Sequence, residues 1–333
     1  MNFRTYLFAT LFLTGVLATS CAVTPEEDTY FASDRVMKSW IKVNYPGISP
    51  YGDTGAYILE MEPGSGPAVS DTAFIRAHYV KRRLDASITS TNIQRLAEQI
   101  GSYTATTYYG GNTWQVGKGY LPDALETVLK TMRSGGHVKL ALPVSASDHE
   151  FSLYNAFSGT SESDNLVIDV TIDTVLTDIY AYQEKTMRAW FQEHYASTDT
   201  LTEGLYFKKL VEKLEANDTI PEGNNVSVRY IGRTLDGRVF DTNIEDTAKF
   251  YRIWNSSKTY SALSISYYKE DESKFSSENS VVGGFGKAIQ HMNYGEKAAA
   301  VFNSKLGYEE KGSSPSIPEY APLYFWLYIE PKD

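Results

Sequence analysis

The chain has 333 residues, which exceeds the usual length of one domain, so two domains are expected. Its 42% hydrophobic and 14% aromatic content is enough for packed cores, and 25 Tyr with 15 Phe argue for sheet and against an all-helical protein. The formal charge of −10 gives no long-range attraction for phosphate backbones, which excludes nucleic acid as an expected partner.

The start of the chain has the pattern of a secretory signal peptide. A basic Arg4 precedes an apolar run, Tyr6–Ala18, which is too short and wrongly flanked for a permanent transmembrane helix. Small residues then precede Cys21, the only cysteine, in a place that resembles the lipobox of bacterial lipoproteins. We expect residues 1–20 to be a signal peptide and residues 21–34 a lipidated tether in the cell envelope, on its periplasmic or outer-membrane face. The alternative is an incidental cysteine in an ordinary cleaved signal.

The rest of the chain contains an internal sequence repeat, with matching residues about 150 positions apart. Met37, Trp40 and Tyr45 align with Met187, Trp190 and Tyr195, and the segment from Tyr79 to Asp85 aligns with that from Tyr230 to Asp236. We therefore expect two related domains, residues 35–184 (the first copy) and residues 185–333 (the second copy).

Each copy is predicted to contain a Trp-bearing helix, several strands and one core helix. The leading helices are expected near Asp34–Val43 and Ala181–His194, with Trp40 and Trp190 buried against a sheet. Strands of the first copy are expected near Ala73–Arg82, Tyr103–Tyr109, Val138–Pro143 and Leu166–Val175. Strands of the second are expected near Val226–Thr234, Tyr251–Trp254, Ala298–Asn303 and Leu323–Ile329. The core helices are expected near Pro122–Met132 and Gly286–Met292, which gives an α+β fold.

Three ordered motifs in the second copy describe an apolar pocket on a small antiparallel sheet. They are VSVRYIGRTLDGRVFDTN, VVGGFGKAIQHMNYGEKAAAVF and KLGYEEKGSSPSIPEYAPLYFWLYI. Such a pocket suits an uncharged, proline-like ligand better than a phosphate or a metal. The motifs resemble the FKBP-type peptidyl-prolyl isomerases over residues 221–330, apart from an insert near 253–280. The resemblance implies two FKBP-like domains, each a curved antiparallel sheet wrapped on one short helix.

The resemblance also implies roles for individual residues of the second copy. Tyr308 would hydrogen-bond the substrate, the Val282 N–H would anchor a flanking carbonyl, and Asp241 would orient polar atoms at the pocket edge. The substrate-binding walls would be Tyr230, Phe240, Phe250, Val281, Phe285, Ile317 and Phe325. Phe285 stands where the best-studied members carry Trp.

The implied reaction needs no cofactor and no metal. Amide resonance separates the cis and trans forms of an X-Pro bond by roughly 18–20 kcal/mol. A twisted bond has lost this resonance, so a dry aromatic pocket favours it over the planar form. The five His are scattered and no second Cys exists, which argues against zinc.

The first copy departs from the pattern where the chemistry is expected. It has Thr89 and Ser90 at the places of Phe240 and Asp241, and Phe157 in place of the phenol. We therefore expect a degenerate, non-catalytic first copy.

The resulting hypothesis is a peptidyl-prolyl isomerase that assists folding of exported proteins. Its partners would be proline-containing polypeptides and, through the lipid anchor, a membrane, while the oligomeric state is not predicted. The alternatives are a non-catalytic FKBP-like peptide-binding module or chaperone of the envelope, and a structural envelope component.

Overall fold

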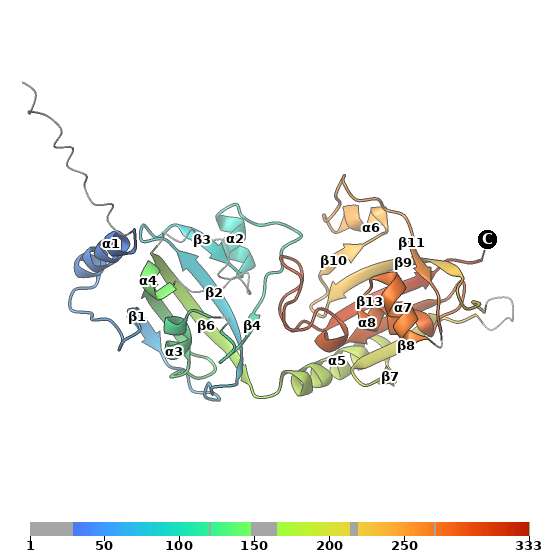
Figure 1. Cartoon of the computed structure of the whole chain (residues 1–333), viewed down its shortest axis with the longest axis horizontal. Coiled ribbons are helices and arrows are strands. Elements are labelled where there is room, and N and C mark those ends of the chain that lie inside the picture. The colour runs from blue at the N-terminus through green and yellow to red at the C-terminus, as the bar shows by residue number, and fades with distance from the viewer. Residues whose placement is uncertain (1–28, 120, 148–164, 214–218, 270, 333) are drawn as a thin grey trace, which may run out of the picture.

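The computed structural model describes residues 29–119, 121–147, 165–213, 219–269 and 271–332, and its ribbon forms two units side by side (Figure 1). The expected signal peptide and Cys21 lie outside the described residues. Helix α1 (Thr29–Asn44) begins within the expected tether, so the end of residues 21–34 is helical. None of the described helices is long and apolar enough to cross a bilayer.

Two antiparallel sheets with the same strand order form the two units. The first contains β1 (Tyr57–Glu62), β2 (Phe74–Arg82), β3 (Ile88–Thr91), β4 (Asn112–Gln115), β5 (His137–Leu142) and β6 (Leu166–Leu176). The second contains β7 (Thr200–Thr202), β8 (Leu205–Val211), β9 (Asn225–Thr234), β10 (Val239–Thr242), β11 (Leu263–Ser266), β12 (Lys297–Phe302) and β13 (Leu323–Ile329). The first sheet has the order β1-β5-β6-β2-β3, with β4 paired to β2, and the second repeats it as β8-β12-β13-β9-β10, with β11 paired to β9. A common order in both sheets is what duplication of one unit would produce.

One short helix packs against one face of each sheet. In the first unit α3 (Asp123–Leu129) buries Leu125, Val128 and Leu129 against the strands. In the second, α8 (Gly283–Gln290) buries Phe285 and Ile289. This confirms the α+β fold expected from the sequence.

The leading helices cover the opposite faces of the sheets. Because side chains alternate along a strand, Ala299 and Val301 of β12 face away from α8 and contact Met187 and Phe191 of α5 (Ile179–Tyr195). Helix α1 packs on the first sheet in the same way, and the Trp40 indole Nε1 donates to Leu84 O at 2.9 Å. The assignment of this indole to packing is therefore consistent with its contacts.

The unit boundary is short and comes slightly earlier than expected. Helix α5 begins at Ile179 and packs on the second sheet, only two residues after β6 ends at Leu176. Asp178 caps α5, since its Oδ1 accepts from Tyr180 N at 2.9 Å and Ala181 N at 3.0 Å.

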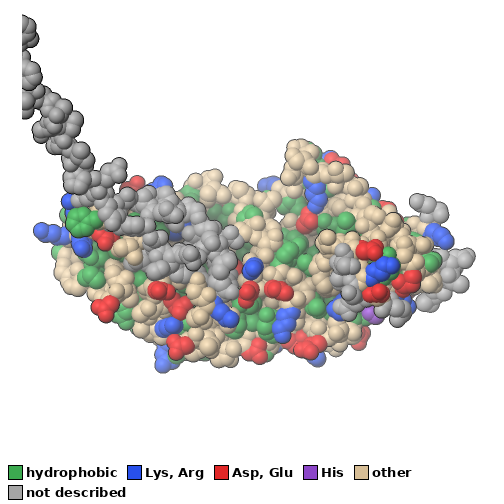
Figure 2. All heavy atoms as spheres, in the orientation of Figure 1, with side chains coloured by type: hydrophobic (Ala, Val, Ile, Leu, Met, Phe, Trp, Pro, Cys, Tyr) green, Lys and Arg blue, Asp and Glu red, His purple; other side chains and the backbone are tan. Residues whose placement is uncertain are grey.

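The visible face of the molecule carries acidic and basic side chains interspersed over both units (Figure 2).

Two predicted strands do not exist in the structure. Residues 103–109 form turns in which the Tyr103 and Tyr109 rings stack at 5.3 Å, and residues 251–254 follow α6 (Glu245–Phe250) with Arg252 at φ 60°. The strands that pair there are β4 and β11, which lie further along the chain. Aromatic residues favour strands only where a neighbouring strand offers a partner, and these tyrosines have none. The remaining described elements are α2 (Gln94–Gln99), α4 (Val144–Ser147), α7 (Glu272–Asn279) and a 3₁₀ turn, η2 (Ser304–Leu306).

Candidate active site

Four aromatic rings from four elements meet on the face of the second sheet that packs against α8. They are Tyr230 of β9, Phe240 of β10, Phe285 of α8 and Phe325 of β13. Phe285 meets Tyr230 with ring centroids 5.8 Å apart at 90° and Phe325 at 5.3 Å and 84°, while Phe240 meets Phe325 at 5.6 Å and 80°. Such edge-to-face contacts are the preferred geometry of aromatic pairs. We call these four residues the aromatic cluster.

A glycine and a β-bulge bring the cluster together. Gly232 of β9 lies opposite Phe325, and a Cβ added to it would come 2.6 Å from Phe240 Cζ and 2.9 Å from Phe325 Cε1. The pairing of β10 with β9 shifts register between Val239 and Asp241, so Phe240 is the extra residue of the bulge. The bare backbone at Gly232 therefore makes the space into which the Phe240 ring turns.

Asp241 lies at the polar edge of the aromatic cluster. Its Oδ2 accepts from the Tyr230 hydroxyl at 2.7 Å, and its Oδ1 forms an ion pair with the ammonium of Lys258. Burial first, and then the Asp241 charge, raise the pKa of Tyr230, so its phenol stays protonated and donates. The Lys258 ammonium also lies 6.0 Å from the Tyr230 ring centroid.

Tyr308 presents a second phenol near this edge. Its side chain is 37% exposed, and burial together with the Asp241 charge raises its pKa. Within the described part of the chain its hydroxyl has no hydrogen-bond partner. Tyr308 is therefore a protonated donor that a bound ligand can use.

The loop before α8 supplies a backbone donor and two apolar side chains. Val282 is the N-cap residue of α8, with φ −65° and ψ 147°, and no described residue accepts a hydrogen bond from its N–H. Val281 and Val282 are half-buried against the second core, and Ile317 is buried in it. Among the predicted residues, Tyr230, Phe240, Phe285, Phe325, Val281, Val282 and Ile317 belong to one hydrophobic cluster. Asp241 bonds to Tyr230 of this cluster, and its charge also acts on Tyr308.

Comparison with known proteins identifies this part of the chain. Residues 217–329 match a family model described as FKBP-type peptidyl-prolyl cis-trans isomerase. This segment belongs to that family. Over 122 residues the chain is 30% identical to peptidyl-prolyl cis-trans isomerase FKBP15-2 of Arabidopsis thaliana, covering 37% of this chain and 59% of the relative. A probable FKBP-type peptidyl-prolyl cis-trans isomerase of Haemophilus influenzae is 27% identical over 126 residues, covering 38% of this chain and 42% of the relative.

The chain therefore spans 42% to 59% of the length of these two curated relatives. Among solved structures, the three FKBP domains of wheat FKBP73 match with a TM-score of 0.30 and 19% identity, over 84% of this chain and 95% of that one. A TM-score this low says nothing about how the two copies are arranged. Residues 217–329 are called the FKBP-type domain below.

Phe250 does not join the aromatic cluster of the FKBP-type domain, contrary to the sequence-based expectation. Its side chain is 78% exposed at the end of α6, and its ring contacts Tyr251 at 5.0 Å. Phe250 therefore lies on the solvent side of α6, while Ala248 is the residue that this helix buries.

The insert supplies a residue that sequence reasoning missed. Lys258 reaches back from the loop between α6 and β11 to pair with Asp241. Its position in a polar stretch gives no signal in the sequence, because only the path of the loop brings its ammonium to the carboxylate. Both side chains are partly exposed, at 32% and 44%, and a surface ion pair of this kind contributes only about 0–1 kcal/mol.

The equivalent face of the first copy is built differently from that of the FKBP-type domain. The Tyr79 hydroxyl lies 3.0 Å from Ser90 Oγ where the second copy has a carboxylate, and Thr89 donates to Lys81 O at 3.2 Å. The indole of Trp114 is fully buried 6.3 Å from the Tyr79 ring. Tyr79 itself is buried, whereas Tyr230 is half-buried. Phe157, expected at the place of the phenol, lies outside the described residues.

Proposed function

We propose that the FKBP-type domain catalyses cis–trans isomerisation of X-Pro bonds in polypeptides. The observation that carries this is the aromatic cluster, bordered by the phenols of Tyr230 and Tyr308 and by the N–H of Val282, for which no described residue is an acceptor. A proline ring against these aromatics would be held in surroundings poor in water. In the twisted X-Pro bond the carbonyl carries less charge than in the planar bond, so removal from water costs the twisted form less. The pocket therefore stabilises the twisted form relative to the planar one.

The polar groups have separate tasks in this proposal. The Val282 N–H and the Tyr308 hydroxyl would bind carbonyl oxygens beside the proline, which orients the peptide across the cluster. Asp241 would hold the Tyr230 phenol through the 2.7 Å hydrogen bond between them, and so fix one wall. No covalent step is involved, because the reaction breaks and makes no bond.

The test is the rate of cis-to-trans conversion of a short proline peptide, measured with the full chain by exchange NMR. Replacing Tyr308→Phe and Asp241→Val together should lower kcat/KM by roughly tenfold or more. The matched control is Tyr79→Phe with Ser90→Ala in the first copy, which should leave the rate unchanged. A wild-type rate equal to that of buffer refutes the proposal.

A second candidate is a binding module that holds proline-containing chains without turnover. The ion pair of Lys258 with Asp241 favours it, because an ammonium at the polar edge can bind a carbonyl of the ligand and so slow its release. Such a protein would suppress aggregation of an unfolded client while leaving peptide isomerisation at the buffer rate. Measuring both quantities on the same preparation separates the two functions.

We further propose that the chain is exported and anchored in the cell envelope through Cys21, where it assists the folding of exported proteins. The support is the apolar run ending in small residues directly before this lone cysteine. Mass spectrometry of the mature N-terminus tests it, since Cys21 should carry acyl chains and Cys21→Ser should release the protein into the soluble fraction. An unmodified Cys21 would refute the anchor while leaving the isomerase proposal untouched.

A further inference from the structure

One loop of the FKBP-type domain has an active-site side and a side that contacts the first copy. Residues 308–322, called the docking loop here, carry Tyr308 and Ile317 toward the candidate site. On the other side, Pro315 O accepts from Tyr108 N at 2.7 Å. The same residues that would bind substrate are therefore on a segment that the first copy holds.

Two side-chain hydrogen bonds extend this contact along β4. Asn112 Nδ2 donates to Glu319 Oε2 at 2.9 Å, and the Tyr320 hydroxyl donates to Gln115 Oε1 at 2.9 Å. The Tyr320 ring also meets Phe74 edge to face at 5.2 Å. Both ends of the short strand β4 thus hold the docking loop.

The contact continues into the first copy toward the residue equivalent to Tyr230. Asn92 Nδ2 donates to Asn112 Oδ1 at 2.8 Å, and Asn92 Oδ1 accepts from Tyr79 N at 2.8 Å. Asn243 of the second copy makes the matching bond with Tyr230 N at 3.0 Å. A chain of hydrogen bonds therefore joins the docking loop to β2, which lies between β6 and β3 in the first sheet.

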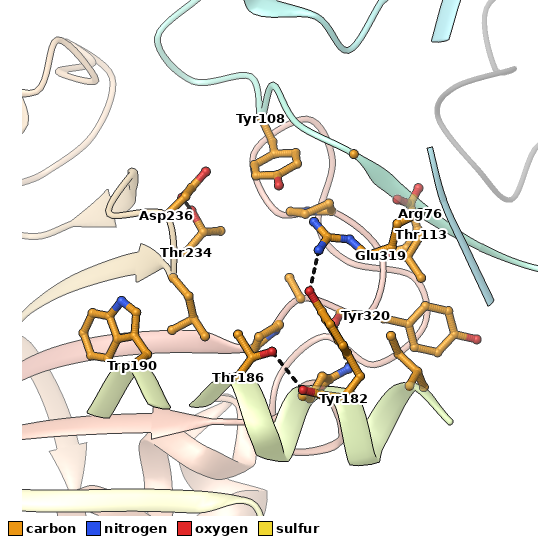
Figure 3. Close-up of a pocket in the computed structure, with 17 residues that line it drawn as sticks. Arg76, Tyr108, Thr113, Tyr182, Thr186, Trp190, Thr234, Asp236, Glu319 and Tyr320 are labelled. Atoms are coloured by element: carbon orange, nitrogen blue, oxygen red, sulfur yellow. Dashed lines mark hydrogen bonds between the residues drawn. The ribbon is translucent and has the colours of Figure 1, made fainter. Parts of the chain in front are cut away.

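A cavity of about 290 Å³ lies beside these bonds, between the two units (Figure 3). Arg76 of the first sheet crosses it to the Tyr182 hydroxyl of α5 at 2.8 Å, and Glu319, Trp190 and Asp236 also line it. Protein interiors are otherwise densely packed. The docking loop is also held from within its own domain, because Ile317 and Tyr320 are buried and Gln183 Nε2 of α5 donates to Tyr320 O at 2.9 Å. The bonds to β4 act on the side of the loop that borders the cavity, where fewer side chains pack against it.

The buried Glu319 side chain makes the contact between the docking loop and β4 depend on hydrogen bonding. Its side chain is 4% exposed, and a buried carboxylate needs hydrogen-bond donors to replace those of water. The Asn112 amide supplies one of them. Removal of the carboxylate would release the loop from Asn112, whereas an isosteric amide could still accept the same hydrogen bond.

We propose that the first copy is a positioning element for the FKBP-type domain, in which Asn112 and Gln115 hold the docking loop so that Tyr308 and Ile317 stay at the aromatic cluster. This inference rests on the proposed isomerase function. It gives the non-catalytic copy a task in the reaction, exerted through the loop and without contact to the substrate.

The expected kinetic signature follows from a two-state loop. When only a fraction of the molecules has the loop in place, apparent substrate affinity falls by that fraction, while a molecule that has bound substrate turns over normally. In the full chain, Glu319→Ala with Tyr320→Phe should raise KM for a proline peptide by about fivefold or more and change kcat by less than about twofold. Amide hydrogen exchange over residues 308–322 should become faster in parallel.

Two further variants keep the test specific. Glu319→Gln retains an acceptor for Asn112 and should restore KM to nearly the wild-type value. Tyr182→Phe removes the hydrogen bond from Arg76 in the same cavity without touching the docking loop, and should leave KM and exchange unchanged.

The inference is overturned if the double variant keeps the wild-type KM and exchange, or if Tyr182→Phe raises KM as much. A fall in kcat alone also contradicts it, because the loop would then act on the chemical step. If the wild-type chain does not isomerise peptides, the proposed function fails, and hydrogen exchange alone decides whether β4 holds the loop.

Discussion

The buried carboxylate of Glu319 should make the stability of the protein depend on pH in a defined direction. Burial, opposed by hydrogen bonds from its own backbone N–H and from Asn112, raises its pKa from the usual 4.5 to about 7. The folded protein therefore keeps this proton to higher pH than the unfolded chain does. Stability from this group is complete below pH 4.5 and falls as the pH rises to about 7.

The size of the effect follows from the two pKa values. One pKa unit corresponds to about 1.4 kcal/mol, so the gap between 4.5 and about 7 amounts to a loss of about 3 kcal/mol in the free energy of unfolding. Glu319→Gln has no proton to lose at this position. The difference in unfolding free energy between Glu319→Gln and the wild type should therefore increase by about 3 kcal/mol, in favour of the variant, as the pH rises across this window.

Urea unfolding of the full chain, at a pH below 4.5 and at one above 7, measures this difference. Glu60→Gln is the matched control, because Glu60 is an exposed carboxylate whose side chain is 58% accessible in its pair with Lys139. Its unfolding free energy should run parallel to that of the wild type at both pH values. A gap between wild type and Glu319→Gln that does not change with pH would refute the reasoning.

Three other substitutions test separate parts of the structure. Gly232→Ala would put a Cβ 2.6 Å from Phe240 Cζ, so the aromatic cluster must shift and kcat/KM should fall by roughly tenfold or more; an unchanged value would show that the cluster is not used. Met187→Ala empties a fully buried site between α5 and the second sheet and should cost about 2–5 kcal/mol in urea unfolding, with a loss below about 1 kcal/mol contradicting that burial. Lys258→Ala should change the free energy of unfolding by less than about 1 kcal/mol, because the ion pair is at the surface. It also leaves the Asp241 carboxylate available to a ligand, so KM should fall for a peptide with Lys beside proline and not for one with Glu. Equal changes in KM for both peptides would contradict this.

The sheets could be predicted from the sequence because their strands carry the signal themselves. β9 and β13 have apolar residues at the positions that face α8. The alignment of the two copies also indicates each of these strands a second time, at the matching place in the first copy. The helix boundaries are predicted less accurately: α8 begins at Gly283, earlier than expected, and Gly284 of its first turn fits against the Phe302 ring, where an added Cβ would come 2.2 Å from Phe302 Cγ. The helix there is set by space in the core and not by helix propensity.

The candidate site could be predicted where its residues come from regular strands, and not where they come from the insert. Tyr230, Phe240, Asp241 and Phe325 are on β9, β10 and β13, so their meeting follows from the topology. The position of Lys258 depends on the path of the loop between α6 and β11, which the sequence does not specify. Phe250 is exposed because it lies at the solvent-facing end of α6. Glu319 gave no signal either, since a carboxylate becomes buried only through the contact between the two copies.

The two-residue joint between the copies has a consequence of its own. Thr177 and Asp178 alone separate β6 from α5, whose C-terminal half packs on the second sheet, so the chain has little slack there. A rotation of one copy relative to the other would therefore have to move α5, in addition to the docking loop. Lengthening this joint by several glycines would leave the contacts of the docking loop with β4 to hold the two copies together.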